Sequence, residues 1–196
     1  PVRPPRPAIE PRNLRFSLGK GVPRHWHGGR RSLSIFFDQL SIFFPAGERF
    51  FMDSVKRFQK RVTDPALARD VTAFCAQEGI HGREHDRYNA LLRAHGYPVD
   101  VLERRVRRLL AFARETLPPR CQLAVTCALE HYTATLGRFV LADDRALEGA
   151  HPEMAALWRW HAAEENEHKS VAYDVFEAAG GTYLERVSMM ALASVI

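Results

Sequence analysis

The sequence contains 196 residues, 46% of them hydrophobic and 26% charged, which is typical of one globular domain and excludes a wholly disordered or fibrous chain. The net charge of +5 comes from residues 1–31, which hold eight basic residues and one acidic residue, whereas the rest of the chain has 20 basic and 22 acidic residues; a basic nucleic-acid-binding face on the folded body is therefore not expected. The three cysteines form no CxxC pair, and the chain shows neither the apolar stretch of a signal peptide nor one long enough to span a membrane, so we expect a cytoplasmic protein.

Residues 1–31 also contain six of the twelve prolines, which favours an irregular basic arm ahead of a helical domain over residues 32–196. No segment alternates apolar and polar residues as a strand does, and proline and glycine stand where helices would begin and end, so we predict an all-α fold. In chain order, helices are expected over residues 33–61, with Pro45 starting the second part of this first helix, then over 65–95, 98–116, 118–149 and 152–179, and from about 182 onward.

The apolar seams of four of these helices are interrupted by ionisable residues. Bundle helices repeat apolar residues at steps of three and four, and here the centre of each repeat is acidic or contains histidine. A buried carboxylate is costly unless it is paired or binds a metal, so acids on four packed helices need a shared positive charge. The interrupting residues are Glu48; Glu78, His81 and His85; Glu130; and His161, Glu165 and His168.

The spacing within this set predicts a two-metal site. Glu78 and Glu165 are each followed three residues later by a histidine, which places a carboxylate and an imidazole on one helix face. One such pair alone is more typical of a solvated helix surface, but the chain order Glu, Glu-x-x-His, Glu, Glu-x-x-His is that of a ferritin-like di-metal centre in a four-helix bundle. The ligands expected from this order are Glu48, Glu78, His81, Glu130, Glu165 and His168.

Two further histidines lie on the seams one helical turn from these ligands. Each could hydrogen-bond a ligand carboxylate or bind a metal itself; we favour metal binding for His161, at the ion that His168 binds, and hydrogen bonding for His85, and keep both as candidate ligands. Glu84, Glu164 and Glu167 lie off the seams and are expected at the surface or beside the ligands.

The helix over 98–116 carries no inward acid and suits the long crossover of a ferritin-like bundle. The helix from about 182 is additional to the bundle and ends in the apolar stretch 187–196. This stretch either docks on the bundle or continues in a longer natural chain. A homodimer and a peripheral membrane contact through this last helix are both compatible with the pattern.

The runs FPAGERFF (44–51), QEGIH (77–81) with His85, and WHAAEENEHKS (160–170) resemble a bacterial family described as predicted metal-dependent hydrolases, and the likeness extends from about Val22 to the C-terminus. The resemblance implies a ferritin-like fold, a bound metal and, by its label, hydrolysis. The arrangement of His161, Glu165 and His168 is also similar to the last ligand helix of the p-aminobenzoate N-oxygenase type of di-iron enzyme. In those enzymes the additional histidine binds iron, which favours His161 as a ligand.

Three functions are compatible with these patterns. The first is a di-iron or iron–manganese enzyme that activates dioxygen to oxidise a small organic substrate, because mixed carboxylate and imidazole ligands suit iron and manganese; it would need an electron donor as a partner. The second is a hydrolase in which two metal ions activate a water molecule, as the family label says. The third is a non-enzymatic, ferritin-like iron-binding protein.

Overall fold

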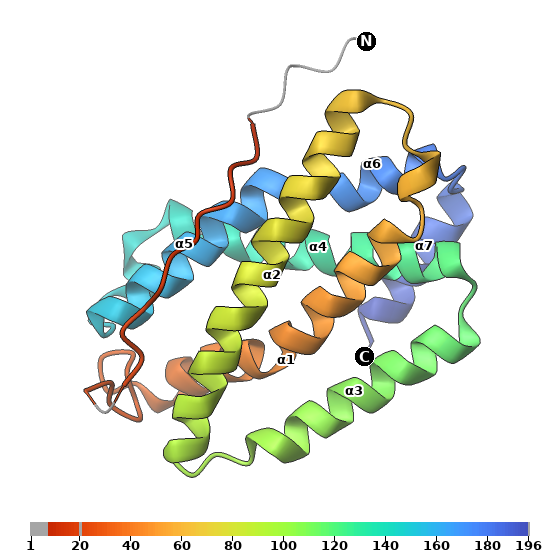
Figure 1. The fold of residues 1–196 in the computed structure, drawn as a ribbon. Coiled ribbons are helices and arrows are strands. Elements are labelled where there is room, and N and C mark those ends of the chain that lie inside the picture. Colours follow the sequence, from red (N-terminus) through yellow and green to blue (C-terminus); the bar gives the residue numbers. More distant parts are fainter. Residues whose placement is uncertain (1–7, 20, 196) are drawn as a thin grey trace.

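The computed structural model describes residues 8–19 and 21–195 of the chain. These residues form α-helices joined by turns and no β-strand, which confirms the all-α prediction (Figure 1). The elements in chain order are α1 (Arg31–Lys56), the 3-10 turn η1 (Gln59–Arg61), α2 (Pro65–Ala94), α3 (Val99–Thr116), α4 (Pro119–Ala142), the 3-10 turn η2 (Asp144–Leu147), α5 (Pro152–His168), α6 (Val171–Ala178) and α7 (Tyr183–Ala193).

Proline and glycine mark the helix ends as predicted. α2, α4 and α5 each have a proline in the first turn, where its missing N–H removes no helical hydrogen bond. Gly96 and Gly180 follow the ends of α2 and α6 with φ angles of +78° and +75°, a conformation that is unfavourable for residues with a Cβ. Thr182 then begins α7 with a capping box to Glu185, which satisfies two backbone N–H groups.

Three of the expected helices are shorter than predicted. The first ends at Lys56. The fourth ends at Ala142, because Asp143 is extended and its carboxylate accepts the backbone N–H of Arg145 at 3.0 Å, which starts a separate 3-10 turn. The fifth is divided by a turn into α5 and α6.

Pro45 does not start a second helix but lies within α1. A proline inside a helix leaves the carbonyl group four residues earlier without its helical donor. That carbonyl belongs to Ser41, and the side-chain amide of Asn89 on α2 donates to it at 3.1 Å. The interruption predicted at Pro45 is therefore avoided by a hydrogen bond that ties α1 to α2.

The helices that carry the predicted ligands pack in two pairs, α1 with α2 and α4 with α5. Figure 1 shows α1 and α2 in front of α4, with α6 continuing beyond α5. α7 packs on α4, so the part of the apolar C-terminal stretch up to Ala193 lies on the bundle. α3 joins α2 to α4, packs mainly against α1 and buries only Val99.

The apolar core is divided into two clusters. Along α2, Phe74 belongs to one cluster and Tyr88 to the other. Along α5 and α6, Trp158 belongs to the second cluster and Val171 to the first. The predicted ligands on these helices lie between the two clusters, so the ionisable residues occupy the middle of the bundle.

The described part of the arm contains no helix and runs along α2 and α5 (Figure 1). Phe16, Val22 and Trp26 are buried in the cluster that contains Tyr88 and Trp158. The arm is therefore part of the core at this end of the bundle. None of the helices within the described residues combines the length and hydropathy needed to cross a membrane.

Candidate metal centre

The eight residues predicted as ligands lie together in one buried cluster between the helix pairs. Each is at most 3% exposed. They form four overlapping groups of three, and within each group one side-chain nitrogen or oxygen per residue lies within 4.8 Å of the other two. The groups are Glu48–His85–His161, His81–His161–Glu165, Glu48–Glu78–His81 and Glu78–Glu130–His168.

Glu78 and Glu165 lie between the two histidines of the Glu-x-x-His pairs. His81 Nδ1 is 3.9 Å from Glu78 Oε2 and 3.7 Å from Glu165 Oε1. His168 Nε2 is 3.7 Å from Glu78 Oε1 and 3.8 Å from Glu165 Oε1. These separations are too long for hydrogen bonds, but they are compatible with pairs of atoms that bind one ion at about 2.0–2.2 Å. Both carboxylates can therefore reach two ions.

Several of these buried atoms have no hydrogen-bond partner among the described residues. Both oxygens of Glu48 and of Glu78 lack one, as does one oxygen each of Glu130 and Glu165. A buried polar atom without a partner is costly, and metal ions would supply the missing partners, so the residues fit a metal centre. Three buried histidine nitrogens of the cluster also lack a hydrogen-bond partner: His81 Nδ1, His161 Nε2 and His168 Nε2.

Without metal ions, the buried carboxylates of the cluster repel one another. Burial raises the pKa of Glu48 and Glu78 well above the usual range, and the neighbouring carboxylates Glu165 and Glu130 raise it further. Burial disfavours charge on His168, but Glu130 and Glu165 outweigh it and raise its pKa to about 9. Burial also disfavours ionised Glu165, whose pKa is nevertheless held below the usual range by the histidines around it. Divalent ions would relieve the repulsion among the carboxylates.

A chain of hydrogen bonds fixes the tautomers of His85 and His161. The Asn89 side-chain N–H donates to the Ser41 carbonyl group, so Asn89 Oδ1 accepts from the Ser41 hydroxyl at 3.0 Å. The oxygen of that hydroxyl accepts from His85 Nδ1 at 2.9 Å, and His85 Nε2 accepts from His161 Nδ1 at 3.1 Å. Because each neutral imidazole has one donor and one acceptor, His161 Nε2 keeps a free lone pair.

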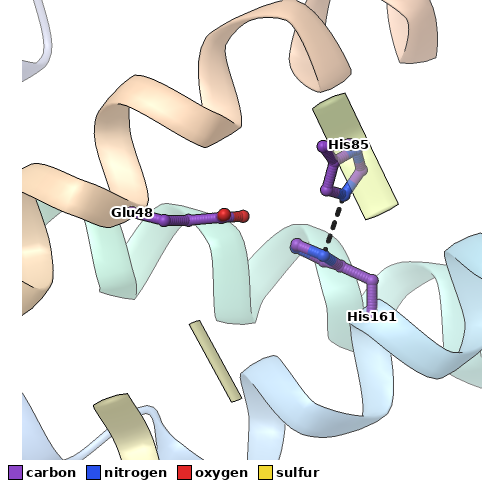
Figure 2. A group of neighbouring side chains, drawn as sticks. All are labelled: Glu48, His85 and His161. Atoms are coloured by element: carbon purple, nitrogen blue, oxygen red, sulfur yellow. Dashed lines mark hydrogen bonds between the residues drawn. The ribbon is translucent and has the colours of Figure 1, made fainter. Parts of the chain in front are cut away.

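That nitrogen faces the cluster. His161 Nε2 lies 3.2 Å from Glu165 Oε1 without hydrogen-bond geometry, and Figure 2 shows the Glu48 carboxylate extending toward the His85–His161 pair. An unprotonated imidazole nitrogen is a good metal ligand. His161 is therefore suited to bind a metal, whereas both nitrogens of His85 are engaged and suit it to hold His161.

His161 does not lie where the helix spacing suggested. It groups with His81 and with Glu48, and not with His168. His161 precedes Glu165 by four residues and His168 follows it by three, so the two histidines are about 10 Å apart along the axis of α5. The expectation that both bind the same ion is not supported, because the ring of His161 lies 4.3 Å from that of His81, centroid to centroid.

Glu164 supports His81 from the side opposite the cluster. His81 Nε2 donates to Glu164 Oε2 at 2.9 Å, so Nδ1 keeps its lone pair and faces the cluster. Glu164 is fully buried, and Arg12 of the arm donates to its other oxygen from the backbone N–H at 3.1 Å and the guanidinium at 3.2 Å. Arg12 also pairs with Glu167 at 2.6 Å. A basic residue of the arm thus balances an acid beside the centre.

Glu84 is also fully buried and attaches the arm to α2. Its carboxylate accepts from the Phe16 backbone N–H at 3.2 Å, from Arg83 at 2.8 Å and from Arg87 at 2.6 Å. For Glu84, Arg87 at i+3 on the same helix is a local signal of an ion pair, but its contact with Phe16 is not visible in the spacing. For Glu164 the partner Arg12 is distant in the sequence, and the concentration of arginine in the arm is its only signal.

Comparison with known proteins adds one family. The family model described as "Predicted metal-dependent hydrolase" matches residues 10–196, a span that includes Arg12 and every residue of the cluster. No curated protein and no solved structure matches the chain.

Proposed function

We propose, from the premise that the chain belongs to the family of predicted metal-dependent hydrolases, that its buried cluster binds two divalent metal ions and that the protein is a two-metal hydrolase. The observation that carries the proposal is the set of buried carboxylate oxygens and imidazole nitrogens that face one another without hydrogen-bond partners among the described residues. Carboxylate and imidazole donors together suit iron and manganese best.

In this proposal each ion has a carboxylate and a histidine of its own. Glu48 and His81 would hold one ion, with His161 as a further nitrogen ligand. Glu130 and His168 would hold the other. Glu78 and Glu165 would be shared by both ions, in keeping with their distances to both histidines. The ligand set is therefore Glu48, Glu78, His81, Glu130, His161, Glu165 and His168, with His85 as the support of His161.

The residues of the chain position the ions and their ligands. Two divalent ions would lower the pKa of a water molecule and polarise the bond that it attacks. Glu164 holds His81 Nδ1 toward the cluster, and His85 does the same for His161 Nε2. The two apolar clusters cover the centre on two sides, and a cavity between α1 and α2 reaches Glu48 and Glu78.

A second candidate function is oxidation of a small organic substrate at the same centre, with iron or iron–manganese, dioxygen and an electron donor. Aromatic rings pack on the histidines: Phe44 stacks on His161 with centroids 4.7 Å apart, and Trp160 meets His81 edge-on at 4.8 Å. An apolar shell of this kind protects a reactive oxidant and is not needed for hydrolysis. The family description supports the hydrolase.

Metal content tests the centre. Protein stripped with a chelator and reloaded with Mn(II), Fe(II), Co(II) or Zn(II) should bind two ions per chain, measured by mass spectrometry of the metals and by titration calorimetry. Glu78→Gln removes a carboxylate shared by both ions and should bind at most one ion tightly. Glu115→Gln, the same chemical change at an exposed position of α3, should still bind two. A wild-type protein that binds no ion contradicts the proposal.

Turnover separates the two candidates. The metal-loaded protein should cleave members of a panel of carboxylic and phosphoric esters without oxygen, and Glu78→Gln should not. Iron-loaded protein that consumes dioxygen in the presence of a reductant and cleaves no ester would favour oxidation instead.

A further inference from the structure

A cavity of about 460 Å³ leads to the proposed centre between α1 and α2. Its inner end is formed by Glu48 and Glu78, which are buried, and its outer end by Arg49, Gly79 and Asp86, which are exposed. A much smaller cavity, of about 20 Å³, lies against His161 on another side of the cluster. We call the larger cavity the α1–α2 passage.

Two glycines keep the passage open. Gly79 and Gly82 are three residues apart on one face of α2 and line the passage, although glycine disfavours a helix interior relative to alanine. A Cβ at Gly82 would lie 3.1 Å from Glu48 Oε2, and a Cβ at Gly79 would meet no atom within 4 Å. The absence of side chains at these positions leaves free both the Glu48 carboxylate and the space in front of it.

Arg49 lies at the mouth, where its charge acts on the nearby Asp86 carboxylate. It makes no hydrogen bond or ion pair with any described residue, whereas Arg83 and Arg87, which also line the passage, are bonded to Glu84. Arg49 and Asp86 also line a second cavity of about 350 Å³ that continues toward Arg107 on α3. The approach to the centre therefore runs past Arg49 and Asp86, and because Arg107 and Arg93 also act on the Asp86 carboxylate, positive charge exceeds negative charge there.

The net charge at the inner end of the α1–α2 passage would allow an anion to bind there. Two divalent ions would neutralise the four carboxylates of the proposed centre, so no negative charge remains there to repel a negative group. A guanidinium offers two parallel donors that fit a carboxylate or a phosphate. The passage thus has an ion at one end and an anion-binding group at the other.

We propose that the α1–α2 passage is the route by which substrate reaches the metal centre, and that Arg49 selects a small substrate with a carboxylate or phosphate group. The inference rests on the proposed two-metal centre. It adds the class of substrate and the face of the molecule from which the substrate binds.

The test uses Co(II)-loaded protein, with inorganic phosphate and acetate as probes and the visible Co(II) absorption as the readout. Both anions should change the spectrum of the wild type. Gly79→Leu fills open space at the mouth, so it should fold and bind two Co(II) ions but weaken the effect of phosphate at least about tenfold. Ala76→Leu, which adds the same side chain to an exposed position of α2 outside the passage, should bind phosphate like the wild type.

Charge at the mouth is tested separately. Arg49→Gln should weaken phosphate binding about tenfold, the size expected for a lost charged hydrogen bond, with two Co(II) ions still bound. Arg105→Gln, the same loss of charge at an exposed position of α3, should not. The relative affinities of phosphate and acetate identify which group the passage prefers.

The outcomes are distinguishable. A wild-type protein that binds no Co(II) overturns the two-metal centre itself. Two bound Co(II) ions with the wild-type phosphate response in Gly79→Leu overturn the route alone. Equal phosphate affinities in Arg49→Gln and Arg105→Gln overturn the selection by Arg49.

Discussion

His81 and His161 each present an unprotonated nitrogen to the cluster because another side chain occupies the second nitrogen. Glu164 accepts from His81 Nε2 at 2.9 Å, and His85 Nε2 accepts from His161 Nδ1 at 3.1 Å. Such partners set the orientation and basicity of the imidazole, and their loss lowers metal affinity by about 10–100-fold. The properties of the bound metal should therefore depend on two residues that are not proposed ligands.

The first concerns Glu164, which contacts a proposed ligand and is itself no ligand. Glu164→Gln should lower the affinity for the ion at His81 by about 10–100-fold, because an amide neither accepts as strongly nor carries the charge that stabilises the bound imidazole. Arg12→Gln should also lower this metal affinity, by a smaller factor. The measurement is calorimetric titration with Mn(II), and Arg15→Gln, which removes an exposed charge of the same arm, is the control. Equal affinities in Glu164→Gln and the wild type would contradict this role.

The second concerns Ser41, at the start of the chain that ends on His161. Ser41→Ala removes the acceptor of His85 Nδ1, so His85 can change tautomer and His161 Nε2 is no longer held free of a proton. Two metal ions should still bind, since every carboxylate ligand remains, but the visible spectrum of the Co(II) form should shift. An unchanged spectrum would contradict the role of the Ser41–His85 hydrogen bond in holding His161.

At the scale of the helices, the turn between α6 and α7 depends on the size of one residue. A Cβ at Gly181 would lie 2.3 Å from the ring of Phe176, which is completely buried. Gly181→Ala should therefore displace the ring and lower the free energy of unfolding by about 1–3 kcal/mol. Gly21→Ala, where a Cβ meets nothing within 4 Å, should cost far less. Denaturant titration measures both, and equal losses would refute the steric explanation.

Periodicity along one helix was enough to predict which residues of that helix share a buried face. Glu78 and His81 were predicted to share a buried face because their spacing is local, and they do lie in one buried cluster. The end of α4 was missed because it depends on the extended backbone of Asp143 and its own hydrogen bond to Arg145. Composition and spacing do not encode such local geometry.

Contacts between residues far apart in the sequence explain the other features that the sequence did not predict. Glu164 was expected at the surface or beside the ligands, and its complete burial depends on Arg12, 152 residues earlier. The uninterrupted course of α1 through Pro45 depends in the same way on Asn89, which donates to the carbonyl group of Ser41, 48 residues before it. Neither of these two contacts can be inferred from a single sequence.

At the scale of the whole molecule, the metal-free protein should be more stable near pH 6.5 than near pH 9. His168, with its pKa raised to about 9, keeps its proton in the folded state over most of this window, and the raised pKa values of Glu48 and Glu78 act in the same direction. The unfolded chain does not hold these protons above the ordinary histidine value of 6.5, so stability rises as pH falls through this window.

The lowered pKa values of His81 and His85 do not oppose this trend, because both residues are neutral in the folded and the unfolded state above pH 6.5. Bound metal ions should replace the protons and reverse the slope, since their ligands must be deprotonated. Thermal unfolding of the chelated and the Mn(II)-loaded protein across this range measures both slopes. A melting temperature of the chelated protein that rises with pH would contradict the prediction.

Synthesis of the chain imposes an order on the assembly of the centre. Arg12 leaves the ribosome before Glu164, 152 residues later, and at about 5–20 residues per second this interval is roughly 8–30 s. During that time the arm has no partner on α5, and Glu48 and Glu78 lie on helices without the second half of the ligand set. Ions that bind the proposed centre would therefore not meet the full ligand set until His168 has been synthesised, and without them the folded domain would hold an uncompensated cluster of acids in its interior.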